Sequence, residues 1–162
     1  MGPSSHVDQS LVLVWARDSV MDVFKTTFGL NAVQVSAPPP SEQSGELIFS
    51  EIRFEGAFEV CIKVSISAVG AERLSSIALS MPSAEICDAH VDDLVGEMSN
   101  MVLGAVKSRV SDLGIPCRML LPTVTRSQAI FPMAASECGS GMLYFRFEKH
   151  CLAVELSVTH TA

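Results

Sequence analysis

The sequence predicts an α+β domain in which two long helices cover one face of a single, mostly antiparallel sheet. Residues 88–113 form the longest segment with an unbroken helical period and no proline. Residues 46–67 and 142–159 alternate apolar and polar side chains, as the strands of hairpins do. The order helix, extended segment, loop, hairpin occurs twice, so we expect two pseudo-equivalent α-β-loop-β-β units, at about 10–82 and 83–162.

Length and composition favour one domain with a large apolar interior. The chain has 162 residues, of which 48% are hydrophobic, and its mean hydropathy is +0.36. This is enough apolar material for a sizeable core, with some left for a subunit interface. We expect residues 1–9 to be a flexible leader and residues 10–162 to form the single domain.

The charge of the chain disfavours some classes of partner. The formal net charge is −7, the sequence pI is about 5.0, and the lysines and arginines are scattered. Without a basic stripe, nucleic acid and anionic membrane surfaces are poor partners, and a protein or a small molecule is the better expectation. No apolar run approaches the length of a membrane span, so a cytoplasmic location is the default.

The first unit opens with a helix that ends at a glycine. Apolar residues follow a helical period from Ser10 to Phe28, and Gly29 supplies the stop. We expect the helix to end near Phe28, with Asp18 or Ser19 capping an inner start.

A short strand, a hairpin and a second helix complete this unit. The expected elements are a half-buried strand, a hairpin of two strands and a short helix, at residues 31–37, 46–54 with 57–67, and 71–79. Glu55-Gly56 is suited to the tight turn of the hairpin, and Met81-Pro82 closes the short helix.

The second unit repeats this order after the long helix. We expect an extended segment, an irregular stretch and a second hairpin, at residues 117–121, 122–141 and 142–159. In both hairpins one face is apolar and the other is largely polar, so one face of the sheet belongs to the core. A second copy of the chain could cover the other face or an edge.

The long helix has two distinct faces. Its expected apolar stripe consists of Val91, Leu94, Val95, Met98, Val102, Ala105, Val106 and Leu113. At about 100° per residue, a polar set falls within roughly 80° on nearly the opposite side: Asp93, Glu97, Asn100, Gly104 and Ser108. A carboxylate and a carboxamide three positions apart therefore point the same way. An ordinary solvated helix face has the same spacing, so spacing alone assigns no function.

Neither the histidines nor the cysteines form a pattern typical of catalysis or metal binding. The five cysteines are odd in number, widely spaced and without a C-x-x-C pair, which argues against a disulfide framework and a zinc site. None of the four histidines has a recognisable spacing to a serine, a cysteine or another metal ligand. We therefore expect buried, reduced thiols and no metal site.

Residues 94–109, LVGEMSNMVLGAVKSR, with Leu113-Gly114 and then residues 121–124, LPTV, resemble the CheX members of the CheC, CheX and FliY family of chemotaxis phosphatases. The hallmark of this family is an acidic residue or serine, three residues, then Glu-x-x-Asn, with a glycine four residues after the Asn. The similarity extends to the first helix, which ends VFKTTFG at Gly29, and to the order of elements in both halves. The resemblance implies a CheC-like fold and covers most of the chain beyond the leader.

The resemblance also implies an activity, a hydrolase that removes the phosphoryl group from the aspartyl phosphate of a CheY-like response-regulator receiver domain. In that activity Asn100 would orient the attacking water, and Glu97 would pair with the receiver's active-site lysine. Asp93, Gly104 and Met101 would contact the partner. The chain would bind no cofactor of its own, because the receiver supplies Mg²⁺, and it would form a homodimer.

Other interpretations remain beside this one. CheC-type members carry two Glu-x-x-Asn helices, whereas the corresponding place in the first helix reads Asp18-x-x-x-Asp22-x-x-Lys25. A lysine cannot hold a water as an amide does, so we expect one active face per chain. The same fold could also serve as a non-catalytic receiver-binding or signalling scaffold module. A small-molecule sensor would require a closed apolar pocket, which the sequence does not indicate.

Overall fold

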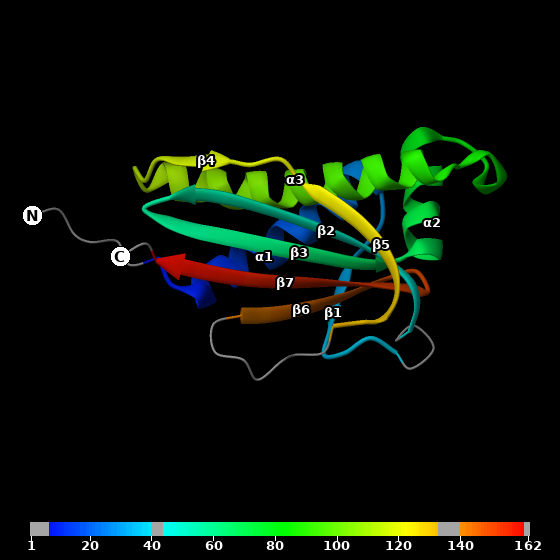
Figure 1. Ribbon diagram of the computed structural model, residues 1–162, viewed down its shortest axis with the longest axis horizontal. Coiled ribbons are helices and arrows are strands. Elements are labelled where there is room, and N and C mark those ends of the chain that lie inside the picture. Colours follow the sequence, from blue (N-terminus) through cyan, green and yellow to red (C-terminus); the bar gives the residue numbers. More distant parts are fainter. Residues whose placement is uncertain (1–6, 40–43, 133–139, 161–162) are drawn as a thin grey trace, which may run out of the picture.

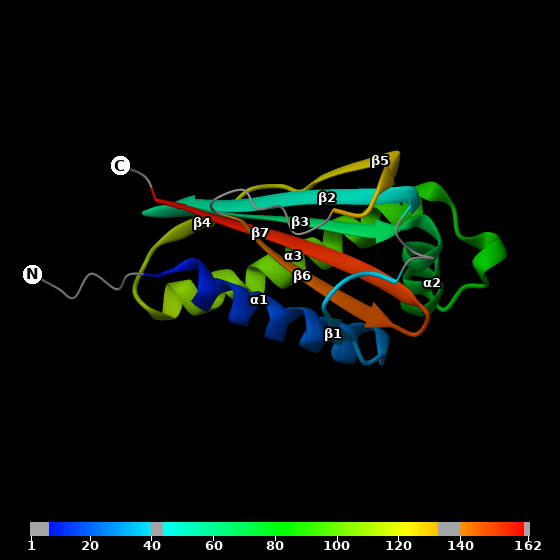
Figure 2. The ribbon, with the colours of Figure 1, turned by 90° about the horizontal axis from the view of Figure 1, so that it is seen from below.

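The computed structural model describes residues 7–39, 44–132 and 140–160. Figures 1 and 2 show one sheet with α1 (Gln9–Val23) and α3 (Asp88–Asp112) on the same face, and α2 (Ala68–Leu79) packed at one end. The strands are β1 (Val33–Val35), β2 (Ser44–Gly56), β3 (Phe58–Ser67), β4 (Cys117–Met119), β5 (Thr123–Ile130), β6 (Ser140–Phe147) and β7 (His150–His160). The predicted fold class, an antiparallel sheet covered by two long helices, is confirmed.

The order of the strands has an internal symmetry. The sheet runs β1-β6-β7-β3-β2-β4, with β5 also paired to β2, and the pairings between the described strands are antiparallel. Exchanging β1 with β4, β2 with β6 and β3 with β7 gives the same order in reverse. The two hairpins therefore pair with each other at the centre of the sheet, through β3 and β7. The short strand of each half pairs with the hairpin of the other half, β1 with β6 and β4 with β2. The residue bounds of the two units stay a prediction.

The start of α1 differs from the prediction. The Asp8 carboxylate accepts a hydrogen bond from the Leu11 backbone N–H at 2.9 Å, so Asp8 caps the helix, and Gln9 is its first residue. The predicted inner cap at Asp18 or Ser19 is wrong, because the helix is continuous through both positions. Val7, which belongs to the predicted leader of residues 1–9, is buried. Residues 1–6 lie outside the described part of the chain.

The end of the first helix is as expected, with one addition. Residues Phe24–Phe28 form a π-helical turn, and Gly29 terminates it with a φ of 64°. A positive φ is readily adopted by glycine, which explains why the helix stops here.

The hairpins and the short helix are confirmed, with small shifts of their ends. The β2–β3 and β6–β7 hairpins are antiparallel and in continuous register. Helix α2 begins three residues before the expected start, because the Ser67 hydroxyl caps it by accepting from the Gly70 N–H at 3.0 Å.

The irregular stretch predicted from Pro122 to Gly141 is wrong for Thr123–Ile130, which forms β5. Among the described strands it pairs only with β2, and its side chains are exposed or half-buried throughout. Because this edge strand buries few large apolar side chains, it lacks the apolar alternation of the hairpin strands, and its sequence resembles a loop. Residues 133–139 lie outside the described part.

The helix-free face of the sheet is less polar than predicted. The large core lies between the sheet and the helices, but a second apolar cluster lies on the other face, formed by Leu47, Phe131, Tyr144 and Ala153. The Tyr144 hydroxyl donates a hydrogen bond to the Pro132 carbonyl at 2.6 Å. The chain that leaves β5 thus folds back over this face and covers part of it.

Helix α3 begins at the predicted residue and ends one residue before the predicted end, at Asp112, and its buried face is slightly rotated. Most of the expected stripe is buried, whereas Ala105 and Leu113 are exposed and Leu103 and Val110 are buried instead. The reason is that α3 packs against α1 as well as against the sheet, which widens the buried sector toward Leu103. Among the described residues, no helix is long and apolar enough to cross a membrane.

Candidate functional site

The polar face of α3 presents an acid and an amide to solvent from a rigid support. Asp93, Glu97 and Asn100 are exposed, while Val95 and Met98 on the opposite side are 0% and 1% exposed. Because the buried side chains fix the rotation of the helix, Glu97 and Asn100 are held side by side at the surface. Within the described part of the chain, no hydrogen bond or ion pair occupies either side chain.

A groove of about 450 Å³ runs beside this pair. Its lining comprises Asp92, Asp93, Gly96, Glu97, Asn100, Leu121, Pro122 and Val124. Two segments singled out in the sequence, the Glu-x-x-Asn turn and the LPTV segment, therefore form the two walls of one groove. Asp93 also lines this groove; its contact with a partner stays a prediction.

Gly96 allows the two walls to approach each other. A Cβ at this position would lie 3.4 Å from Val124 Cγ2 and 3.7 Å from Pro122 Cγ. A side chain larger than alanine would therefore push the LPTV segment away from α3. Before this segment, the Leu120 backbone N–H donates to the Arg53 carbonyl at 2.9 Å, which ties it to β2.

Arg126 anchors the start of β5 to the first turns of α3. Its Nε donates to Asp92 Oδ1 at 2.9 Å, and its Nη2 donates to the Asp88 carbonyl at 3.1 Å. Its Nη1 lies 3.5 Å from a carboxylate oxygen of Glu46. Burial alone would lower the pKa of Arg126, but the hydrogen bond to Asp92 and the nearby carboxylates outweigh it and raise that pKa above its usual value.

The groove is acidic and contains an amide. Asp92, Asp93 and Glu97 contribute carboxylates to its wall, and the Asp92 carboxylate is already engaged by Arg126. A partner that enters the groove must therefore bring positive charge to Glu97 and Asp93.

The remaining predicted site residues lie outside this groove lining. Gly104 is half-buried, and a Cβ added to it would have no atom within 4 Å. Met101 is half-buried on the side of α3 that faces α1, with its sulfur 3.9 Å from Thr27 Oγ1. Glycine at 104 is therefore not required by packing within the chain, whereas Met101 is held by an internal contact.

A second, smaller hollow lies on the other side of Glu97. It measures about 240 Å³ and is lined by Leu79, His90, Asp93, Leu94 and Glu97. Sequence reasoning missed Leu79 and His90, because nothing in the local pattern indicates that the end of α2 lies beside α3. Asp93 and Glu97 form the wall that separates this hollow from the groove.

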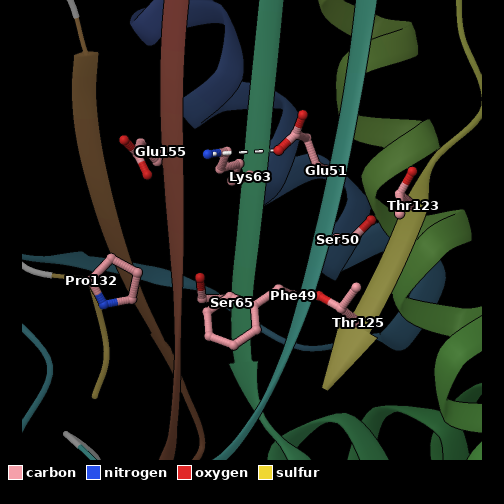
Figure 3. Close-up of a pocket in the computed structure, with 9 residues that line it drawn as sticks. All are labelled: Phe49, Ser50, Glu51, Lys63, Ser65, Thr123, Thr125, Pro132 and Glu155. Atoms are coloured by element: carbon pink, nitrogen blue, oxygen red, sulfur yellow. Dashed lines mark ion pairs between the residues drawn. The ribbon is translucent and has the colours of Figure 1, made fainter. Parts of the chain in front are cut away.

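The helix-free face of the sheet carries a hollow of about 460 Å³ that contains none of the predicted site residues (Figure 3). Lys63 Nζ lies 3.6 Å from Glu51 Oε2 in its floor, and Glu155 lies on the other side of Lys63 (Figure 3). These charges distinguish it from the closed apolar pocket that a small-molecule sensor would require. Thr123 points to this side, whereas its neighbours Pro122 and Val124 line the groove on α3.

The described residues show no group of three or more histidine, cysteine, aspartate and glutamate side chains that could hold a metal ion. The chemistry available in the groove is that of carboxylates, an amide and backbone groups. These groups can orient a water molecule and bind a cation on a partner.

Comparison with solved structures identifies the class of fold. The chemotaxis protein CheX from Vibrio vulnificus is 21% identical, covers 91% of this chain and 95% of that chain, and gives a TM-score of 0.72. A CheC-like superfamily protein from Shewanella sp. PV-4 is also 21% identical, covers 91% and 96%, and gives 0.73. A chain in the CheX-CheY-BeF3-Mg²⁺ complex from Borrelia burgdorferi is 14% identical, covers 92% and 98%, and gives 0.66. The chain thus has the fold of CheC-like chemotaxis proteins.

Comparison with family models identifies the family. The model described as chemotaxis phosphatase CheX matches residues 48–146, which is more than half of the 162 residues. This chain belongs to the CheX family of chemotaxis phosphatases. The membership predicted from the motif is thereby confirmed. Comparison with curated protein sequences found no match.

Proposed function

We propose that this chain dephosphorylates the aspartyl phosphate of a CheY-like receiver domain, with Glu97 and Asn100 inserted into the receiver's active site. The groove on α3 carries the proposal, because an exposed carboxylate and an exposed amide lie one turn apart on a helix that is buried on its other side. Membership in the CheX family supports the class of reaction. The complex of CheX with CheY, BeF3 and Mg²⁺ supports the class of partner.

Asn100 would orient the attacking water. A carboxamide offers both an acceptor and a donor, so its oxygen can accept a hydrogen bond from the water while its NH₂ donates to a neighbouring oxygen. The water oxygen would attack phosphorus in line with the aspartyl oxygen. The P–O bond to the receiver's carboxylate would then break, releasing inorganic phosphate and a free aspartate. A carboxylate in place of the amide would repel the phosphoryl oxygens.

Glu97 would anchor the helix on the receiver. Its carboxylate is exposed, and a charge-assisted pair with the receiver's active-site lysine would hold α3 across the site. Asp93, in the same groove, would add negative charge toward the receiver. Met101 and Gly104 are proposed partner contacts at the edge of this face.

The chemistry needs no cofactor bound by this chain. The acyl phosphate is already activated, and in this proposal Mg²⁺ belongs to the receiver, where it neutralises charge on the phosphoryl oxygens. The chain contributes positioning and a water-orienting amide. We propose further that it acts in the cytoplasm as a homodimer, as the resemblance implies.

Phosphate release from phosphorylated receivers tests the proposal. We expect Asn100→Ala to lower the rate about a hundredfold or more while binding is largely kept, since one oriented hydrogen-bonding group is lost. Glu97→Ala should raise KM as well as lower the rate, because it removes the docking charge. Ser108→Ala is the matched control, because Ser108 is exposed on the same helix, and its hydroxyl donates to the Gly104 carbonyl of that helix at 3.1 Å.

The outcomes separate the enzyme from the non-catalytic scaffold. Equal rates of phosphate release for wild type, Glu97→Ala and Asn100→Ala would show that the site assignment is wrong. A wild-type chain that binds receivers without accelerating phosphate loss from any of them would instead support the alternative, a receiver-binding or signalling scaffold module.

A further inference from the structure

Leu121 is a large apolar side chain with almost no internal contact. It is 90% exposed, more than any other large hydrophobic residue in the described part of the chain. It also lines the groove that contains Glu97 and Asn100. An exposed leucine is common by itself, but one on the rim of a functional groove points to a contact with a partner.

The segment that carries Leu121 is held in place. The Leu120 N–H is bonded to the Arg53 carbonyl at 2.9 Å, and the proline at 122 restricts both its own φ and the conformation of Leu121. Val124 packs close to Gly96 of α3. Leu121 is therefore presented by a stiff segment, so little entropy is lost when a partner covers it.

Apolar surface also lies on the opposite side of the acid and amide pair. The hollow of about 240 Å³ is walled by Leu79 and Leu94 together with Asp93, Glu97 and His90. Leu79 is 47% exposed at the end of α2. Because Asp93 and Glu97 line both cavities, any protein that contacts Glu97 with its active site lies over Leu121 on one side and the hollow on the other.

We propose that Leu121 and the hollow between Leu79 and Leu94 are docking contacts for the receiver domain itself. Leu121 would pack on an apolar patch beside the receiver's phosphorylated aspartate, and the hollow would accept one apolar side chain from the opposite side of that site. The inference rests on the proposed function. It adds that apolar residues flanking the receiver's active site set the specificity among receivers. Glu97 and Asn100 would instead contact groups that all receivers have, the active-site lysine and the aspartyl phosphate.

The charges of this face favour a receiver as the occupant. Carboxylates of Asp93 and Glu97 lie between the two apolar contacts, so the partner must place a cation between two apolar patches. A receiver meets this requirement if its active-site lysine meets Glu97 and its surrounding loops supply the apolar groups. A lipid surface would not fit, because anionic headgroups would face these carboxylates.

Truncation variants test the inference by binding and by kinetics. We expect Leu121→Ala and Leu79→Ala each to raise KM, and the Kd for a CheY-type receiver loaded with BeF3 and Mg²⁺, about tenfold, with kcat within about twofold of wild type. Ile130→Ala is the matched control, since Ile130 is 70% exposed at the far end of β5 and should leave both constants unchanged. Circular dichroism would verify that each variant is folded.

The readouts distinguish this inference from the proposed function. If wild type dephosphorylates the receiver but Leu121→Ala and Leu79→Ala bind it as tightly as wild type, the docking contacts are wrong and the proposed function stands. If wild type hydrolyses nothing but binds the loaded receiver, and the leucine variants bind it more weakly than Ile130→Ala does, the docking contacts stand and the proposed activity falls. A fall in kcat with unchanged KM would also overturn the docking role.

Discussion

Gly104 is a residue that the chain itself does not require. A Cβ at this position would meet no atom within 4 Å, and glycine inside a helix costs about 0.5–1 kcal/mol relative to alanine. We therefore predict that Gly104→Ala stabilises the chain by about that amount, measured by urea unfolding. If the glycine lets the receiver's backbone approach, the same variant should bind the receiver less tightly. A loss of stability would show that Gly104 has a packing role that its surroundings do not reveal.

For single residues, the sequence predicted well which way a side chain points from its helix, but it predicted poorly what surrounds that side chain. Glu97 and Asn100 are exposed where the helical period puts them, because 100° per residue is a local property of the backbone. Leu121, at 90% exposure, could not be found in this way. Its exposure depends on where α3 and β2 hold the segment, which no local pattern encodes. For the same reason the sequence did not predict that Leu103 is buried and Ala105 exposed, since this depends on the packing of α1 on α3.

Among the elements, β5 is held both by its pairing with β2 and by the side chain of Arg126. Of the strands that the structure describes, only β2 pairs with it, and Arg126 links it to α3 through Asp92 and Asp88. We predict that Arg126→Ala lowers the free energy of unfolding by about 1–2 kcal/mol, because it removes charge-assisted hydrogen bonds at a half-buried position. Arg126→Lys should restore only part of this, since an ammonium cannot donate in the same fork.

Urea unfolding of the two variants checks the size of this effect. Because Arg126 also supports the wall made by Pro122 and Val124, Arg126→Ala should weaken receiver binding more than Arg126→Lys does. Identical stability of wild type and Arg126→Ala would show that strand pairing alone holds β5. The sequence could not reveal this link, since Asp88, Asp92 and Arg126 lie on elements whose contact is set by the tertiary fold.

For the whole molecule, the repeated order of elements predicted the sheet but not its connections. The alternation of apolar residues identified both hairpins, because period-2 patterning follows from the strand itself. It did not indicate that each short strand pairs with the hairpin of the other half. These pairings between the halves depend on how the two halves pack around one shared core. Local sequence patterns within each half do not determine them.

The two halves of the fold each contribute one long helix, α1 and α3. We predict that only α3 takes part in dephosphorylation. At the corresponding place on the first helix, Asp22 belongs to α1, but Lys25 lies in the π-helical turn. There the backbone hydrogen bonds span five residues rather than four, so Asp22 and Lys25 do not share the α-helical spacing of Glu97 and Asn100. Besides lacking an amide, the first helix thus has a different geometry. We expect Asp22→Ala and Lys25→Ala to keep kcat/KM within about twofold of wild type, in the phosphate-release assay in which Asn100→Ala is expected to lower the rate about a hundredfold or more. A large loss in either variant would mean that both halves engage the receiver.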